Sequence, residues 1–140
     1  MGAVNFINLL FGHLVGDYVF QNRWMAMNKS GSTFKCVVHC LIYTATVCAF
    51  TWTFTWPWIA LVFLSHFLVD RFSLADIWLK FIRGRNLIEF ATKEPTHAEI
   101  MRGNNPASLV ILRGGFTALV YAVTDNTFHL LIMWYGSRLL

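Results

Sequence analysis

The stretch Cys36–Val69, CVVHCLIYTATVCAFTWTFTWPWIALVFLSHFLV, decides the fold, because it contains no Asp, Glu, Lys or Arg. One helical crossing of a bilayer needs about 20 apolar residues, so this stretch is long enough to cross, turn and start back. The turn is expected at Trp56-Pro57-Trp58, since proline stops a helix and tryptophan favours the depth of the lipid headgroups. Two membrane-spanning helices are therefore predicted, one on each side of this turn.

The composition of the 140-residue chain also indicates a membrane protein. Hydrophobic residues make up 56% and charged residues 13%, against about 45–50% and about 25% in soluble domains. A soluble domain with so little charge would expose large apolar patches and aggregate. Three cysteines are too few, and an odd number, for a disulfide scaffold. We therefore expect an integral membrane protein rather than a soluble enzyme, a disordered chain or a secreted disulfide-rich domain.

Two further apolar segments flank the uncharged stretch, so four helices are predicted. They span about residues 3–24, 34–55, 58–83 and 107–138. Helices are preferred because an open set of strands would leave backbone groups unpaired in lipid. The long polar segment from Gly84 to Pro106 connects the third helix to the fourth. The predicted fold is all-α, an integral membrane four-helix bundle that forms a single transmembrane domain over residues 1–140.

Basic residues gather at two of the three connections between these helices. Three flank the first connection, and six flank the polar one: Arg23, Lys29 and Lys35, then Lys80, Arg83, Arg85, Lys93, Arg102 and Arg113. Because basic connections stay on the cytoplasmic side, we expect a multi-pass protein with both termini outside, in a bacterial inner membrane. The net charge of +4 then serves orientation and contact with membrane lipid. Nucleic acid is not an expected partner, because the aromatic residues lie in the spans and not beside the basic ones.

Three of the four aspartates lie four residues from a histidine. The pairs are His13 and Asp17, His66 and Asp70, and Asp125 and His129. Random placement would give about 0.3 such pairs when matches are counted in this way. Residues i and i+4 share one face of a helix, so each pair presents an imidazole and a carboxylate together.

These side chains favour a metal site within the membrane. An ionisable group at mid-membrane costs about 2.5–3.5 kcal/mol, and a divalent cation offsets that cost because carboxylates and neutral imidazoles are its natural ligands. Four-helix bundles build metal sites from such inward-facing groups. The seven candidate ligands are His13, Asp17, His39, His66, Asp70, Asp125 and His129. A single zinc ion, the expected metal, would use three or four of them, leaving the others to orient the ligands, whereas two ions with a bridging carboxylate would use all seven.

One combination of motifs resembles a known family. The segment Gly12-His13-Leu14-Val15-Gly16-Asp17-Tyr18-Val19-Phe20-Gln21 is followed by Trp24, Asn28-Lys29, a histidine in the second helix, His66-x-x-x-Asp70 and a late Asp-x-x-x-His. Together these are similar to a family of small bacterial and phage membrane proteins known only as a domain of unknown function, over Gly12 to Leu131. This resemblance implies the architecture and the ligand set but no reaction. A looser similarity is to membrane-bound metal-dependent hydrolases with His and Asp inside the membrane.

The expected function is a metal-dependent hydrolase that acts on a lipid or another amphipathic substrate with a phosphate or acyl group. A bound metal lowers the pKa of water toward about 7, and Asp17 or Asp70 would act as catalytic base or proton shuttle. The candidate substrate-binding residues are Gln21, Lys29 and Lys35.

Other classes of protein would use the same residues. A divalent-cation or proton transporter would hold the ion transiently, and an accessory protein that binds another membrane protein would use the metal only to staple its fold. A closed coordination site argues for structure or transport, whereas an open position that holds water argues for hydrolysis. Hydrogen bonding between helices, without any metal, is the remaining alternative. The oligomeric state is left open.

Overall fold

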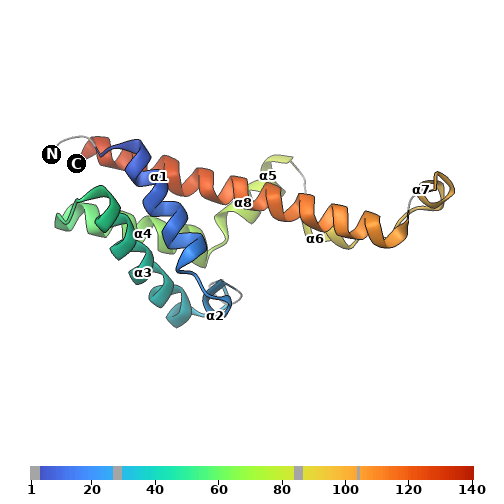
Figure 1. Ribbon diagram of the computed structural model, residues 1–140, viewed down its shortest axis with the longest axis horizontal. Coiled ribbons are helices and arrows are strands. Elements are labelled where there is room, and N and C mark those ends of the chain that lie inside the picture. The colour runs from blue at the N-terminus through green and yellow to red at the C-terminus, as the bar shows by residue number, and fades with distance from the viewer. Residues whose placement is uncertain (1–3, 27–29, 84–86, 104) are drawn as a thin grey trace. The chain divides into compact units, whose positions relative to one another are not determined.

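The computed structural model describes residues 4–26, 30–83, 87–103 and 105–140 (Figure 1). The secondary-structure elements within these residues are all helical, which confirms the all-α prediction. The chain divides into two compact units, and each has its own packing. The first comprises Met1–Leu74 with Asn126–Leu140, and the second comprises Ala75–Asp125.

The region predicted as a first helix over residues 3–24 consists of three segments. They are α1 (Phe6–Leu14), the π-helix η1 (Val15–Val19) and α2 (Arg23–Ala26). Helix α1 starts after Asn5, whose side-chain oxygen accepts a hydrogen bond of 2.8 Å from the backbone N–H of Ile7. The π-helix continues it directly and closes with a bond from the N–H of Phe20 to the carbonyl of Val15. This wider turn ends the first helical run before residue 24.

The uncharged stretch forms two consecutive helices, α3 (Thr33–Thr51) and α4 (Trp56–Arg71). Helix α3 ends where Trp52 adopts the left-handed conformation, with φ of 50°. Pro57 lies in the first turn of α4, where the N–H that proline lacks has no partner within the helix anyway. The connection therefore comes before Trp56 rather than on it, and the proline starts the second helix instead of forming the turn.

The third predicted helix, over residues 58–83, is interrupted. Helix α4 ends at Arg71 and α5 (Leu74–Arg83) follows after Phe72 and Ser73. Ser73 has a positive φ of 49°, a conformation that an α-helix cannot continue through. The rest of the chain holds two short helices and one long one: α6 (Leu87–Thr92), α7 (His97–Met101) and α8 (Pro106–Leu139).

Two glycines allow the N-terminal helices to approach α3 closely. Gly12 and Gly16 have the four-residue spacing with which small residues bring helix backbones together in membranes. A Cβ on Gly12 would lie 3.1 Å from Cα of Val47, and a Cβ on Gly16 would lie 2.8 Å from Cδ2 of Tyr43. This close packing brings Asp17, the residue after Gly16, against α3.

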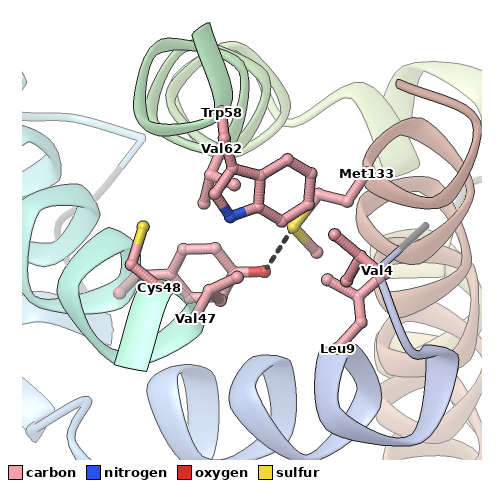
Figure 2. Packing of buried hydrophobic residues seen from close by; sticks show 8 residues of the cluster. Val4, Leu9, Val47, Cys48, Trp58, Val62 and Met133 are labelled. Atoms are coloured by element: carbon pink, nitrogen blue, oxygen red, sulfur yellow. Dashed lines mark hydrogen bonds between the residues drawn. The ribbon is translucent and has the colours of Figure 1, made fainter. Parts of the chain in front are cut away.

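The hydrophobic core of the first unit joins α1, α3, α4 and the C-terminal part of α8 (Figure 2). The dashed line in Figure 2 is the hydrogen bond of 3.4 Å from the Tyr43 hydroxyl to the sulfur of Met133. Nearby, Phe6 packs edge-on against Trp134, with ring centroids 5.1 Å apart. The fully or nearly buried residues of this core are Val4, Leu9, Tyr43, Val47, Cys48, Trp58, Val62 and Met133.

Polar contacts of Arg113 hold part of the second unit together. The Arg113 guanidinium donates hydrogen bonds to the carbonyl oxygen of Lys93 at 2.7 Å and to the carboxylate of Glu99 at 2.6 Å. Glu99 also accepts bonds of 2.8 Å from the backbone N–H and the hydroxyl of Thr96. The bond from the N–H belongs to the capping box of α7. These bonds, of which the one from the Thr96 backbone has the largest effect, lower the pKa of Glu99 from 4.5 to about 2.

Within the described residues, α3 and α8 are each long and apolar enough to cross a membrane. Helices α4 and α5 pass the same test when they are counted as one broken span. These lengths agree with the predicted membrane protein. Four spans, the single transmembrane domain and the orientation of the termini remain predictions.

Candidate metal centre

Four ionisable side chains meet in the interior of the first unit, and we call them the His/Asp tetrad. They are Asp17 from η1, His39 from α3, and His66 and Asp70 from α4. Both histidines are fully buried, and Asp17, the most exposed member, retains 7% of its surface. Each side chain offers one ligand atom to a group in which all atoms lie within 4.8 Å of one another. The tetrad is thus a compact set of nitrogen and oxygen donors that are almost fully buried.

Five of the six distances within the tetrad are near those of a tetrahedral donor set. Nε2 of His39 lies 2.9 Å from Nε2 of His66, and these two atoms lie 3.1 and 3.3 Å from Oδ1 of Asp17. Oδ2 of Asp70 is 3.3 Å from each of the two nitrogens. A tetrahedral ion with bonds of about 2.0–2.1 Å has ligand atoms about 3.3–3.4 Å apart. The four atoms therefore have a spacing close to that required to hold one ion.

Hydrogen bonds alone account poorly for these contacts. Five separations of 2.9–3.3 Å join the four atoms. Ionised carboxylates only accept hydrogen bonds, so the protons must come from Nε2 of His39 and Nε2 of His66. If both nitrogens carry protons, the two hydrogens face each other across 2.9 Å; if only one does, most contacts lack a proton. A shared cation satisfies all four atoms at once, so the tetrad has the chemistry of a metal site.

The two predicted pairs in the first part of the chain contribute to the tetrad differently. On α4, His66 and Asp70 lie on one face as predicted, and both belong to the tetrad. His13 and Asp17 are separated by the start of the π-helix, and the nearest contact, from Nδ1 of His13 to Oδ2 of Asp17, is 3.7 Å. Asp17 directs its other oxygen, Oδ1, to His39 and His66.

His13 lies beside the tetrad and is held by other groups. Its Nδ1 is 2.7 Å from the hydroxyl of Tyr43, and its Nε2 is 2.5 Å from Oδ1 of Asn126. The amide nitrogen of Asn126 donates in turn to the hydroxyl of Tyr18. Both ring nitrogens of His13 thus face protein groups, and the structure places this predicted ligand next to the four donor atoms of the tetrad and not among them.

His129 contacts two tetrad members, His66 and Asp70. Its Nδ1 is 3.0 Å from Nδ1 of His66, and its Nε2 is 3.4 Å from Oδ1 of Asp70. These are the atoms of His66 and Asp70 that do not belong to the tetrad. Asp125 lies one helical turn before His129 on α8, and it is the last residue of the second unit. Its role as a ligand remains a prediction.

The three predicted substrate-binding residues have separate positions. Nε2 of Gln21 lies 3.3 Å from Nε2 of His39, and Gln21 is only partly buried. The ammonium group of Lys35 lies over the ring of Trp24, 5.1 Å from its centroid. Lys29 lies outside the described residues. Of the three, Gln21 is therefore the one that the structure brings to the tetrad.

Two residues at the site were missed by the sequence analysis. The ring of Tyr43 stacks on His66, with centroids 3.5 Å apart and planes 11° from parallel, and its hydroxyl binds His13. Asn126 binds the other nitrogen of His13. Tyr43 comes four residues after His39, the same spacing that identified the His/Asp pairs, so an extended search for polar residues on that face would have found it.

The sequence of the chain matches one protein family. A family model described as protein of unknown function (DUF3307) matches residues 5–135. The chain belongs to the DUF3307 family. This confirms the predicted membership of an uncharacterised family, and the match includes all residues of the tetrad. No curated protein and no solved structure matches this DUF3307 chain.

Proposed function

We propose that this DUF3307 protein is an integral membrane protein that holds one divalent ion, zinc, at the His/Asp tetrad. The observation that carries the proposal is the convergence of four buried donors from η1, α3 and α4 at separations of 2.9–3.3 Å. Two carboxylates and two neutral imidazoles have a charge of −2, which a divalent cation neutralises. Two buried carboxylates would otherwise be a large desolvation cost. Zinc is preferred because the donor set has four members, the usual number for this ion, and contains imidazole.

The proposed environment is a four-helix membrane bundle formed by the predicted spans. Its support is the length and apolarity of α3 and α8, together with large hydrophobic side chains that face outward. Trp52 is 83% exposed, Ile111 75% and Leu112 68%. Such surfaces are unfavourable in water but suit contact with lipid. We place both termini outside and the basic connections at the cytoplasmic face of a bacterial inner membrane, as the charges predict.

The reaction that we propose is hydrolysis of a phosphate- or acyl-containing amphipath. Closed structural zinc sites are built from Cys and His, whereas His with carboxylate ligands and a bound water is typical of hydrolytic zinc. The metal supplies an activated water at neutral pH. Asp17 is the most exposed member of the tetrad, and partly buried Gln21 lies close to it at His39. Substrate would then reach the site on the side of Asp17 and Gln21. In the hydrolase, Asp17 would leave its place on the ion to water and act as base, while His39, His66 and Asp70 would hold the ion.

A second candidate function is supported by the same geometry. Four protein atoms already supply the full number of ligands that a tetrahedral ion takes, and a closed site is typical of a structural or transported ion. The protein would then be a metal-stapled accessory protein or a cation transporter.

Metal analysis of detergent-purified protein tests the metal centre. We expect about one zinc per chain in the wild type and its loss in Asp70→Ala. Asp76→Ala is the matched control, because Asp76 pairs with Lys80 at the surface of α5. Equal metal content in wild type and Asp70→Ala would refute the site.

Hydrolysis assays then separate the two functions. The loaded and chelated proteins are compared on a p-nitrophenyl ester of a long-chain acid and on a bis-p-nitrophenyl phosphodiester, both in mixed micelles. Turnover that requires the metal and Asp17 supports the hydrolase. Absence of turnover on both, with zinc uptake into proteoliposomes or a strong dependence of folding on zinc, supports the second candidate.

A further inference from the structure

We infer that His129 is a positioning residue that orients two metal ligands at once, His66 and Asp70, and does not bind the ion itself. The inference rests on the proposed metal centre and adds a specific role for a residue of α8. It follows from which atoms of the three side chains face one another.

The first step concerns the protons on the two imidazoles. A neutral His66 that binds an ion through Nε2 must carry its proton on Nδ1. That nitrogen lies 3.0 Å from Nδ1 of His129, so His66 donates and His129 accepts. His129 must then carry its own proton on Nε2, which lies 3.4 Å from Oδ1 of Asp70, an acceptor. One tautomer of each histidine therefore gives the hydrogen bond between the two rings and places the proton of His129 on the nitrogen nearest to the Asp70 carboxylate.

The second step is that these contacts close a ring. His66 and Asp70 each direct one atom into the tetrad, Nε2 and Oδ2, and these two atoms are 3.3 Å apart. Each directs its other atom, Nδ1 and Oδ1, to His129. His129 thus fixes the ring orientation of His66 and the rotation of the Asp70 carboxylate at the same time. Groups that orient metal ligands in this way raise ligand basicity, and their loss costs about 10–100-fold in metal affinity.

The third step separates His129 from the ion of the tetrad. Its Nδ1 faces Nδ1 of His66, and its Nε2 lies 3.4 Å from Oδ1 of Asp70, which are the atoms of these two residues that do not belong to the tetrad. The rings of His129 and His66 also pack together, with centroids 4.1 Å apart and planes tilted by 34°. His129 is 1% exposed, so it is held in this place by its neighbours.

A pair of substitutions at residue 129 tests the inference. The glutamine side chain offers one acceptor, Oε1, and one donor, Nε2, and can replace both contacts, whereas leucine offers neither. We expect His129→Leu to weaken zinc binding about 10–100-fold, measured by chelator competition, without changing the limit of one ion per chain. His129→Gln should recover most of this loss. Circular dichroism and thermal unfolding of both variants monitor the fold.

The outcomes separate this inference from the proposed function. Equal loss of affinity in His129→Gln and His129→Leu would overturn the role of His129 while leaving the metal centre intact. Failure of the wild type to bind zinc would refute the metal centre. If His129→Leu does not fold, ¹⁵N spectra of histidine-labelled, zinc-loaded wild type decide. A protonated Nε2 and an unmetallated Nδ1 on His129 support the inference, and a zinc-bound nitrogen on His129 overturns it.

Discussion

Gly16 lies directly against the ring of Tyr43, so that a Cβ on Gly16 would come within 2.8 Å of Cδ2 of Tyr43. The same ring stacks on His66 at 3.5 Å. The ring of Tyr43 therefore lies between the backbone of η1 and His66, a member of the tetrad. A substitution that displaces this ring should also displace His66.

We accordingly expect Gly16→Ala to destabilise the protein by about 1–3 kcal/mol, the usual cost of overpacking a core, and to weaken zinc binding. Unfolding in detergent and chelator competition measure the two effects. Gly115→Ala is the control, because a Cβ at Gly115 meets no atom within 4 Å. It should be neutral or stabilising by up to about 1 kcal/mol, since alanine favours a helix interior. Similar behaviour of the two variants would contradict the close contact.

Substitutions of Tyr43 separate its ring from its hydroxyl. Tyr43→Phe keeps the stack on His66 but removes the hydrogen bonds to His13 and Met133. We expect it to cost about 0.5–1.5 kcal/mol of stability and to leave zinc affinity nearly unchanged. Tyr43→Leu removes the ring as well and should reduce affinity. A larger affinity loss in Tyr43→Phe than in Tyr43→Leu would show that the hydroxyl, and not the stack, supports the site.

Acid should release the metal, because protons and zinc compete for Nε2 of His39 and Nε2 of His66. Imidazole must be neutral to bind zinc, so zinc affinity should fall as the pH is lowered, with up to about two protons taken up per ion. A fluorescent zinc indicator follows the release between pH 7.5 and 5. His97→Ala, at the exposed start of α7, should show the wild-type profile. A flat profile in the wild type would argue against imidazole ligands.

Glu99 should titrate far below an ordinary glutamate. Its pKa is lowered to about 2 because the carboxylate accepts hydrogen bonds from the backbone and hydroxyl of Thr96 and from Arg113. The charged form is favoured, so any stabilisation from these bonds is complete above pH 4.5 and is lost as the pH falls toward 2. Carboxyl ¹³C spectra measure the midpoint, and Glu99→Gln identifies the signal. Thr96→Ala should raise the pKa, and a wild-type midpoint near 4.5 would disprove the capping box.

Much of the fold could be predicted from the sequence, and all four members of the tetrad were among the seven predicted ligands. The uncharged stretch Cys36–Val69 indicates two helices because it is too long for one membrane crossing and contains no charged residue. The pair His66 and Asp70 needed only the helical repeat to be placed on one face, and the structure keeps both in the tetrad. The helix break at Ser73 was missed, because serine does not favour a positive φ and its conformation depends on the surrounding packing.

The division of the candidate ligands into two groups could not be predicted. Whether an imidazole faces an ion depends on which ring nitrogen points inward, and this is set by distant neighbours such as Tyr43 and Asn126 around His13. The π-helix at Val15–Val19, which changes how Asp17 lies relative to His13, also has no local signature that the pattern analysis used. The spacing of His and Asp along the sequence therefore identified the candidate ligands. Contacts between distant residues determine which of them belong to the tetrad.

The order of the donors along the chain has a consequence for biosynthesis. The last tetrad residue is Asp70, whereas α8, which brings His129, begins only at Pro106. A ribosome has thus completed the whole donor set while the longest helix is still to be made. An ion bound at that stage would neutralise the two carboxylates during insertion into the bilayer. Helix α8 would then pack against a metal centre that has already formed.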